Sequence, residues 1–499
     1  MLMKRSFAVR IAKLFYAMFA LSFLWLTVHI VTGSYYGYGE VRLLLCILGA
    51  LALLLGGWKL VNRYEAALVR RSGTVTAGFL AVMLALQVLL GAHLRYQPVF
   101  DVDAVFSGAI EWAETGTFSS YYEYFSYFYN NFGGLRFLRW VFLLTRAFGG
   151  SDYYMAAVVA NSLLSVATMF VTGQVGRRLM GVRGQMMAYV LFAISPPFYF
   201  IAAAFYTDAL SMLFPVLTYW LYLLAKAQSK CSLRLLMCAL MGMSLGLGIQ
   251  LKPTVAIVLV AIVIDALFTW DWKRTLAMVA AVAVLIFAGQ AEMKGAMYQH
   301  LDRAEAEQKG TPILHWVMMG LSRNGFYNGS DYDFTRSFTD KAEQAAALKA
   351  EIRNRIAARG PSGMVKLLTT KGDICFGDGT YGLNDCFRRG ISETGLWELV
   401  LRDGAYYGAY QHACTGLLLA LYLMMIASAC RELFTLKSES ICHMAPRLAV
   451  FGLLLFLLCW EARWRYFSNY VPLIFVSALL GMDSAAKSLN RAGWLLTRT

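Results

Sequence analysis

Long stretches without charged residues constrain this chain more than any other feature. The run VTAGFLAVMLALQVLLGA, residues 75–92, holds no Asp, Glu, Lys or Arg. A helix needs about 17–25 such residues to cross the hydrocarbon core of a bilayer. Only 15% of the 499 residues are charged, against about 25% in an average globular chain. The apolar runs are continuous rather than alternating, which disfavours a β-barrel. The sequence therefore predicts an all-α polytopic membrane protein.

About twelve segments are long and apolar enough to be spans. The predicted spans are residues 14–34, 41–58, 75–95, 153–175, 184–203, 207–225, 235–251, 253–270, 275–291, 404–429, 447–460 and 466–482. The N-terminal run is too long for a signal peptide and lacks a clear cleavage site, so we expect a first membrane helix that stays. Three parts follow: a transmembrane module at 1–291 with a polar loop at 96–152, a large loop at 292–403, and C-terminal helices at 404–499.

Basic residues alternate between connections and predict the orientation, because Lys and Arg are enriched in cytoplasmic loops. Those on one side of the membrane are Lys4, Arg5, Arg10, Lys13, Lys59, Arg63, Arg70, Arg71, Arg177, Arg178, Arg183, Lys226, Lys230, Arg234, Lys273, Arg274, Arg431, Lys437, Arg447, Lys487, Arg491 and Arg498. Short connections on the other side are nearly bare. We therefore expect cytoplasmic termini, extracytoplasmic loops at 96–152 and 292–403, and a plasma membrane location. The net charge of +15 needs no nucleic-acid partner to explain it.

Several polar clusters, far apart in sequence, share the predicted outer side. They are Asp101 and Asp103, Tyr129-Asn130-Asn131, Asp208, Lys252, His315, and Glu461, Arg463, Arg465 and Tyr466. Each has an ordinary reading: a single Asp is usually solvated or a helix cap, Lys252 before Pro253 can mark a loop, and the arginines can pair with lipid phosphates. Ionisable groups at a membrane edge are costly unless paired or used, so the shared side indicates a functional site.

Acids with cations on this side suit one kind of chemistry. Carboxylates serve as general bases or metal ligands, and Arg and Lys neutralise phosphate. These are the groups needed to transfer a sugar from a lipid phosphate. Nucleotide sugars are cytoplasmic, so the usual role of a DxD motif on a nucleotide diphosphate does not fit Asp101 and Asp103.

Seven stretches carry a family resemblance: VFDVDAVFSGAIEWAETGTF, YFSYFYNNFGG, FYTDALSM, LKPTVAI, HWVMMGLSRNGFYNGSDYD, FGDGTYG and EARWRYFSNYVP. In this order they resemble the GT-C superfamily of glycosyltransferases, of the family 39 or protein-mannosyltransferase-like kind in bacterial envelopes. The resemblance implies a GT-C-like bundle, a polyprenyl-phosphate-linked sugar donor and inverting transfer on the extracytoplasmic face.

The resemblance also implies residue roles. An acid of the first outer loop is the catalytic base, which falls on Asp101 or Asp103, with Asp101 preferred. Arg463 and Arg465 hold the donor phosphate, assisted by Lys252. The acceptor or substrate-binding candidates are Asp208, Tyr129, Asn130, Asn131, His315, Glu461 and Tyr466.

Two details depart from the family pattern. Tyr129 stands where a proline is common, and Cys375 precedes Phe376 before the Gly-Asp of the second loop; both leave the acceptor open among an envelope glycan, a lipid or a protein. There is no convincing second acidic pair, so we expect no required cofactor; if a divalent Mg or Mn ion takes part, Asp103 and Asp208 are its candidates.

Two further features lie in the large loop. The stretch TDKAEQAAALKAEIRNRIAA predicts an amphipathic helix, capped by Asp340 with Glu343 and stopped by Gly360-Pro361. Cys375 and Cys386 are predicted to form a disulfide because the outside is oxidising, with two free thiols as the alternative.

Three other functions compete with sugar transfer from a lipid monophosphate. A transporter or flippase would place charges and broken helices near the bilayer midplane. A glycan ligase or polymerase would use a lipid diphosphate donor, and it too would have a large outer loop with arginines. A membrane scaffold or receptor would not require the paired clusters.

Overall fold

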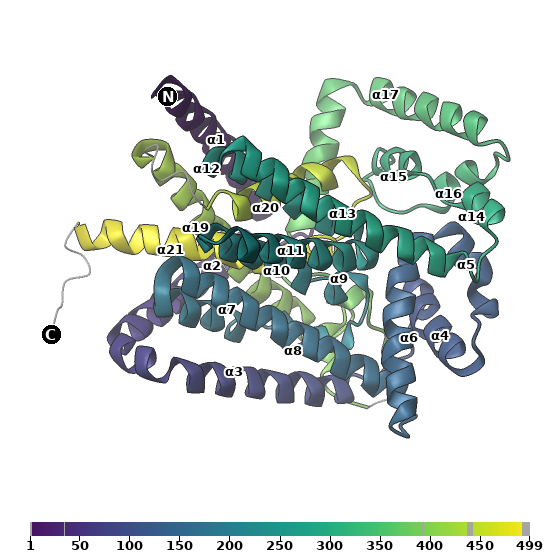
Figure 1. Ribbon diagram of the computed structural model, residues 1–499, viewed down its shortest axis with the longest axis horizontal. Helices are drawn as coiled ribbons and strands as arrows, with labels where there is room; N and C mark the ends of the chain where they lie inside the picture. Colours follow the sequence, from purple (N-terminus) through teal and green to yellow (C-terminus); the bar gives the residue numbers. More distant parts are fainter. Residues whose placement is uncertain (1, 34, 391–392, 437–442, 492–499) are drawn as a thin grey trace.

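The computed structural model describes residues 2–33, 35–390, 393–436 and 443–491, and it is built from helices throughout these ranges. Side chains are described for residues 7–483 within them, so Lys4, Arg5, Lys437, Lys487, Arg491 and Arg498 of the orientation prediction lie outside the described side chains. The longest membrane helices run side by side, and the segments 96–152 and 292–403 gather at the end of the bundle opposite the two chain ends (Figure 1).

Within the described ranges, eight helices are long and apolar enough to cross a membrane, counting α9 and α10 together as Thr207–Ala227. The long helices are α1 (Leu2–Thr32), α2 (Glu40–Arg63), α3 (Glu65–His93), α7 (Tyr153–Ala193), α10 (Leu213–Ala227), α11 (Cys231–Leu251), α13 (Trp272–Met297) and α19 (Tyr407–Thr435). Shorter apolar helices are α12 (Ala256–Thr269) and α20 (Ala445–Cys459), and α21 (Val471–Arg491) closes the chain. With α7 counted as two helices, this set corresponds to the twelve predicted spans.

Helix α7 is a helical hairpin rather than one rod. Met180 and Gly181 leave the helical region, and Gly181 takes φ 67°, which glycine tolerates without strain. The two halves then fold back on each other: a Cβ on Gly176 would lie 2.4 Å from the carbonyl oxygen of Gly184. Small residues permit this close backbone approach, as is common between membrane helices.

Three predicted boundaries are wrong, each for a local reason. The span predicted at 184–203 ends at Ala193, because Pro196 and Pro197 follow and start the short elements α8 (Pro197–Phe200) and η3 (Ile201–Ala203). The span predicted at 207–225 is divided into α9 (Thr207–Leu210) and α10. The last span begins at Val471 instead of residue 466, after a turn that holds Arg465.

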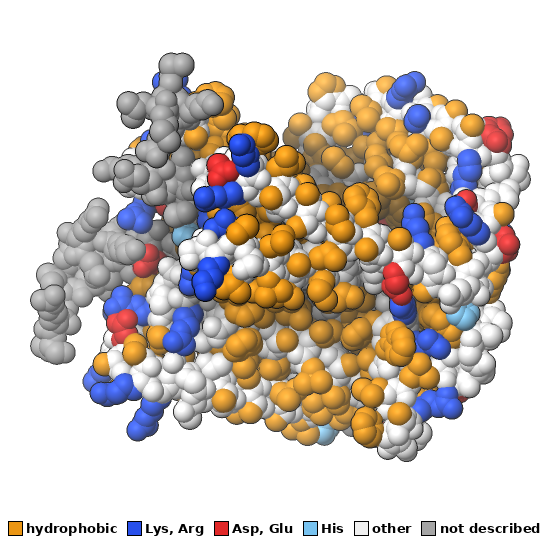
Figure 2. Space-filling model, viewed as in Figure 1, with side chains coloured by type: hydrophobic (Ala, Val, Ile, Leu, Met, Phe, Trp, Pro, Cys, Tyr) orange, Lys and Arg blue, Asp and Glu red, His pale blue; other side chains and the backbone are white. Residues whose placement is uncertain are grey.

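The bundle is held together by contacts between sequence-distant helices. Helix α19 packs against α1, α2 and α21, while α7 packs against α3, α10 and α21. Apolar side chains cover the middle of the face in Figure 2, and Lys and Arg gather toward its two ends. This is the distribution expected of a surface that meets lipid in the middle and water at both ends.

The polar segment 96–152 folds into α4 (Phe100–Thr115), η1 (Ser119–Tyr121), α5 (Tyr122–Tyr127), η2 (Tyr129–Asn131) and α6 (Phe132–Ala147). Helices α4 and α6 pack against each other, and α6 also contacts α7 and α11. A Cβ on Gly133 would lie 1.9 Å from the carbonyl oxygen of Gln250, so only glycine lets α6 meet the end of α11. The segment is thereby fixed against the bundle.

The large segment forms α14 (Arg303–Lys309), α15 (Ile313–Gly320), α16 (Gly329–Arg336), α17 (Lys341–Phe376), η5 (Leu383–Asp385) and α18 (Trp397–Val400). The predicted cap is confirmed: Asp340 accepts a hydrogen bond of 2.8 Å from the Glu343 amide. The predicted stop is wrong, because Gly360 takes φ 62° and turns α17, which then continues to Phe376 (Figure 1). Proline at the first position of the second half is compatible with a new helical start.

Candidate active site

Four chain turns bring their charged side chains together where α9, α11, η5 and η7 (Ser468–Tyr470) meet. Lys252 lies between α11 and η4 (Pro253–Val255) with an extended backbone, as expected for a residue before proline. Its ammonium group pairs with Asp208, and the Arg465 Nε lies 3.1 Å from the other oxygen of that carboxylate. Arg465 Nη1 lies 3.6 Å from Asp385 Oδ2. At its centre, therefore, one carboxylate serves two cations.

This cluster is buried and lined by tyrosines. Asp208 and Lys252 are 6% and 8% exposed. The Lys252 ammonium lies 4.5 Å from the centre of the Tyr466 ring, and the Arg465 guanidinium lies 5.1 Å from that of Tyr206. Burial and the neighbouring Arg465 guanidinium hold the pKa of Lys252 well below its usual range. Lys252 and Arg465 share Asp208, and Arg465 also lies near Asp385, so an anion that binds here would meet two cations that carboxylates already hold in place.

Glu461 organises the other half of the EARWRY segment. Its carboxylate accepts a hydrogen bond of 2.9 Å from the Tyr466 hydroxyl and pairs with Arg463 Nε at 3.1 Å. Burial raises the pKa of Glu461, and the Arg463 guanidinium opposes that rise. Glu461 thus fixes Tyr466 and Arg463 beside the Lys252–Asp208–Arg465 cluster.

Asp101 reaches the cluster through three neutral side chains. The Tyr124 hydroxyl donates to Asp101 Oδ1 at 2.9 Å, and Asn131 Nδ2 donates to the Tyr124 hydroxyl at 2.6 Å. The Tyr206 hydroxyl donates to Asn131 Oδ1 at 3.4 Å, under the Arg465 guanidinium. We call Tyr124, Asn131 and Tyr206 the relay. It connects the first predicted outer loop with the EARWRY turn.

Asp103 faces a different set of partners, because residues two apart on a helix do not share a face. Ser107 Oγ and the Tyr121 hydroxyl donate to its carboxylate at 2.6 and 3.1 Å. Asp101 follows Phe100, which has φ 53° and is 82% exposed. A bulky residue in that region is strained, and such strain is typical of functional sites.

The other predicted substrate-binding residues are distributed unevenly. Asn130 donates to Asn131 at 3.2 Å and so lies beside the relay. Tyr129 is exposed and packs against Gly310, away from the cations. The His315 ring is buried inside the large segment and hydrogen-bonds Thr335 Oγ1 at 2.6 Å. Burial lowers the pKa of His315 to about 4. The structure therefore brings Asn130 and Asn131 to the site but not Tyr129 or His315.

The predicted disulfide is wrong: Cys375 and Cys386 are both free and buried. Cys375 ends α17 near Lys371, whereas Cys386 follows η5 near Arg465 and Lys252. The two thiols belong to different walls of the site, which the glycine-rich turn between them separates. Burial raises the pKa of Cys375 to about 12 and that of Cys386 to about 11, so both are unreactive thiols.

The two metal candidates do not meet. Asp208 is occupied by Lys252 and Arg465, and Asp103 by Ser107 and Tyr121. Within the described ranges, no three His, Cys, Asp or Glu side chains are grouped to hold a metal ion.

Three residues of the site escaped the sequence interpretation: Tyr124, Tyr206 and Asp385. Tyr124 and Tyr206 lie within stretches already singled out, YFSYFYNNFGG and FYTDALSM, and Asp385 directly precedes the candidate Cys386. For Tyr206 and Asp385, closeness in sequence to a candidate residue is the signal that could have found them. Tyr124 shares its stretch with other tyrosines, and nothing in the sequence selects it from them.

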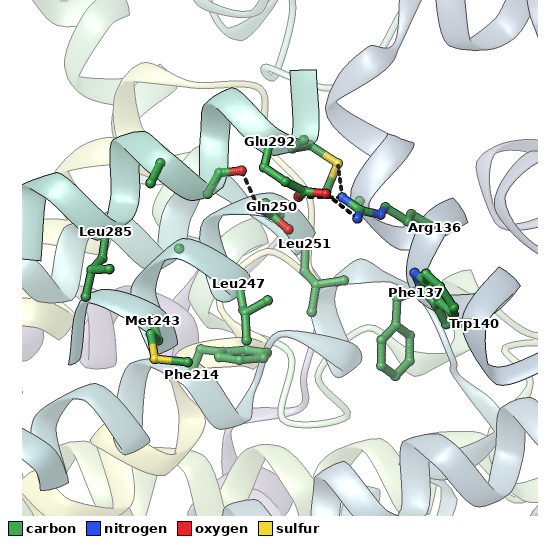
Figure 3. Close-up of a pocket in the computed structure, with 15 residues that line it drawn as sticks. Arg136, Phe137, Trp140, Phe214, Met243, Leu247, Gln250, Leu251, Leu285 and Glu292 are labelled. Carbon is green, nitrogen blue, oxygen red and sulfur yellow. Dashed lines mark hydrogen bonds and ion pairs between the residues drawn. The ribbon is translucent and has the colours of Figure 1, made fainter. Parts of the chain in front are cut away.

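An apolar groove of about 570 Å³ lies between helices of the bundle (Figure 3). Helices α6, α10, α11 and α13 line it with Phe137, Phe214, Met243, Leu247 and Leu251, among others. Arg136 and Glu292 form an ion pair at its rim, with Arg136 Nη1 2.7 Å from Glu292 Oε2. Leu251, one of the lining residues, directly precedes Lys252 of the buried cluster in the chain.

Comparisons with known proteins place the chain among membrane proteins. Two crystal structures of ArnT from Cupriavidus metallidurans are similar to it, one bound to undecaprenyl phosphate and one in the apo state. Each is 14% identical, and the TM-scores are 0.39 and 0.36. The matches cover 85% and 86% of this chain, and 81% of each ArnT chain. No curated protein sequence matches. A family model described as "Conserved hypothetical integral membrane protein" matches residues 2–486, so the chain belongs to this family of integral membrane proteins.

Proposed function

We propose that the protein is a membrane glycosyltransferase of GT-C type. It moves a monosaccharide from a polyprenyl-phosphate donor to an envelope acceptor on the extracytoplasmic face. One observation carries the proposal: the apolar groove extends to Leu251, the residue that precedes Lys252, and Lys252 and Arg465 are buried cations that share Asp208. A lipid with a long apolar chain and a phosphate head fits this arrangement, because its chain suits the groove and its phosphate suits the cations.

The donor binds with its isoprenoid chain along the groove and its phosphate at Lys252 and Arg465. Arg463, held by Glu461, supplies a third positive charge nearby. Arginine suits this role because its planar fork matches phosphate oxygens. Charge that builds on the leaving phosphate is then stabilised by fixed cations, which is usually the largest single contribution to catalysis.

Asp101 acts as the general base. An acceptor hydroxyl transfers its proton to the Asp101 carboxylate while the hydroxyl oxygen bonds to C1 of the sugar. The bond between C1 and the phosphate oxygen breaks, and polyprenyl phosphate leaves with the electron pair. A single displacement inverts the configuration at C1. Asn131, a member of the relay, and Asn130 beside it are positioned to contact the reacting sugar.

The experiment uses purified protein in lipid nanodiscs with radiolabelled polyprenyl-phosphate sugars. We expect transfer to an added envelope extract, or slow hydrolysis without one, and loss of both with Arg465→Ala. The same sugars on polyprenyl diphosphate test the ligase or polymerase alternative. Turnover with the diphosphate alone would contradict the proposal.

The groove has its own test. Leu247 lies in the groove and is 54% exposed, so Leu247→Trp narrows the groove without disturbing the core. Leu235→Trp is the matched control: it lies on the same helix, α11, is 56% exposed, and is outside the groove. Native mass spectrometry should show less retained polyprenyl phosphate only in Leu247→Trp. Equal retention in the two variants would exclude the groove as the lipid site.

A further inference from the structure

A second recess, of about 310 Å³, is lined by η5 and by the residues that follow it. Its polar lining consists of Asn384, Asp385, Arg388, Arg389, Arg402 and Asp403. Unlike the apolar groove, it is rich in arginine, and it belongs to the predicted outer segment. None of its lining residues had been marked as functional from the sequence.

The three arginines differ in their partners. Arg389 pairs with Glu398 at 2.8 Å and Asp403 at 3.5 Å. For Arg388 and Arg402, by contrast, the described residues show no ion pair within 4 Å. Arg388 Nη1 donates to the Phe387 carbonyl oxygen at 2.6 Å, and the Arg388 guanidinium lies 5.9 Å from the Phe100 ring centre. The Arg402 guanidinium lies 3.8 Å from the Trp464 ring centre and interacts with the Tyr407 hydroxyl. Aromatic neighbours orient each guanidinium while leaving its other N–H groups available to phosphate or carboxylate.

The recess also offers unused hydrogen-bond acceptors. Asn384 Oδ1 is buried and has no hydrogen-bond partner within the described part of the chain. Asp385 Oδ2 is also buried, and its 3.6 Å ion pair with Arg465 is too long for a hydrogen bond. Buried polar atoms nearly always have a hydrogen-bond partner, so acceptors without one need an explanation. Sugar hydroxyls are donors that would satisfy both atoms. Arginines without an ion pair beside such acceptors indicate a ligand that has both a negative group and hydroxyls.

The position of the recess connects it to the reaction. Asp385, on its wall, lies 3.6 Å from Arg465 Nη1. Phe100, which faces Arg388, immediately precedes Asp101. The recess is therefore next to both the proposed base and the proposed phosphate cation.

We propose that this recess binds the acceptor, and that the acceptor is an anionic sugar bearing a phosphate or a carboxylate. The assignment as acceptor rests on the proposed function. Arg388 and Arg402 bind the negative group, and Asn384 and Asp385 accept hydrogen bonds from hydroxyls. A neutral lipid or an unmodified protein side chain would leave the two arginines unused.

The test measures binding of hexosamine 1-phosphate to the nanodisc-embedded protein by saturation-transfer NMR, with hexosamine and inorganic phosphate as comparison ligands. The double variant Arg388→Gln/Arg402→Gln should weaken binding of the sugar phosphate by at least about tenfold, since each charged hydrogen bond is worth more than a neutral one. Arg303→Gln, a surface position in α14 that pairs with Glu307, is the matched control and should bind as wild type. Retained polyprenyl phosphate in the double variant, measured by native mass spectrometry, reports that the rest of the site is intact.

Each other outcome overturns the proposal. Equal affinity for hexosamine and its phosphate would exclude an anionic ligand, and equal affinity for inorganic phosphate would exclude a sugar. Weaker binding in phosphatidylglycerol than in phosphatidylcholine nanodiscs would assign the recess to a lipid headgroup. Wild-type affinity of the double variant for the sugar phosphate would show that Arg388 and Arg402 do not bind it. If wild type binds the sugar phosphate through them but neither binds nor turns over polyprenyl-phosphate donors, the proposed function fails while the anionic sugar site stands.

Discussion

Two buried carboxylates in this protein have lysine partners, and their surroundings differ. Asp265 of α12 accepts hydrogen bonds from Tyr222 at 2.7 Å, Lys226 at 3.2 Å and the Met444 amide at 3.0 Å. Both of its oxygens are satisfied, and one acid meets one cation. Asp208 instead holds Lys252 and Arg465 together. Burial and ion pairing are thus common to both clusters, and the second differs because two cations share its central carboxylate and one of them, Arg465, also faces Asp385.

The surroundings reinforce the difference. The Asp208 cluster adjoins the groove and, through Asp385, the arginine-lined recess. The Asp265 cluster joins α10, α12 and the start of α20, and neither the groove nor the recess includes its residues. A satisfied cluster of this kind stabilises the packing of helices. A cluster in which two cations share one carboxylate, next to open volume, is suited to bind a ligand.

The largest expected effect comes from removing one cation from each of the two clusters. Arg465→Ala should lower turnover by about a hundredfold to a thousandfold, because it removes a fixed charge that faces the leaving phosphate. Lys226→Ala, in the Asp265 cluster, should leave turnover per folded molecule near that of wild type. Initial rates with a radiolabelled polyprenyl-phosphate sugar measure both. Similar losses in the two variants would show that the clusters do not differ in role.

The next effect separates the two acids of α4. Asp101→Asn should lose about a hundredfold in turnover, the usual scale of general-base catalysis. Asp103→Asn should lose far less, since Ser107 and Tyr121 hold Asp103 away from the relay. Rates at saturating donor and acceptor provide the measurement. The opposite pattern would move the base two residues along the helix.

A smaller effect concerns stability alone. Asp265→Asn should lower the free energy of unfolding by about 1–3 kcal/mol, because Lys226 loses its partner and Met444 keeps a weaker one. Thermal unfolding in detergent measures the change, and Tyr222→Phe, which keeps the ion pair, should cost less. Turnover per folded molecule should be unchanged. A loss of turnover without a loss of stability would give Asp265 a role in the reaction.

The smallest effect concerns a third buried lysine, Lys371, whose ammonium donates to the Gly320 carbonyl at 2.9 Å. Burial lowers the pKa of Lys371 from 10.5 to about 8. The folded protein therefore binds this proton less tightly than the unfolded chain does, and the contribution of Lys371 to stability increases as pH rises from about 8 to 10.5. Melting temperatures across that range should rise more, or fall less, for wild type than for Lys371→Met. Melting temperatures that change in parallel with pH in the two proteins would contradict a lowered pKa for Lys371.

Most of the helices could be predicted from the sequence, because the length and charge of an apolar stretch are local properties. The capped helix at Asp340 and the paired spans around Arg177 and Arg183 were readable from short stretches. The turn of α17 at Gly360 was read as an end, since Gly-Pro alone does not tell whether a helix resumes beyond it. The disulfide prediction failed because sequence spacing does not reveal that Cys375 and Cys386 lie in different walls.

The candidate site could be predicted in part. Asp101, Asp208, Lys252 and Arg465 stood out because charges are rare at a membrane edge. Tyr124 and Tyr206 did not, because neutral aromatic residues are abundant at such edges and only three-dimensional contacts select two of them. His315 was singled out for its residue type, and it belongs to the interior of the large segment. The charged residues of the site could thus be predicted from their type, whereas the neutral residues that lie between them could not.

The relay has a consequence for how the two ends of the site can evolve. A carboxylate that touches a guanidinium directly binds protons more weakly. Tyr124, Asn131 and Tyr206 keep Asp101 out of such contact with Arg465 while fixing the geometry between them. Arg465 therefore does not contact the carboxylate of Asp101 directly, although hydrogen bonds fix the distance between the two groups. A substitution that changes which anion binds at Arg465 can then leave the proton affinity of Asp101 unchanged, and the reverse holds for the acceptor at Asp101.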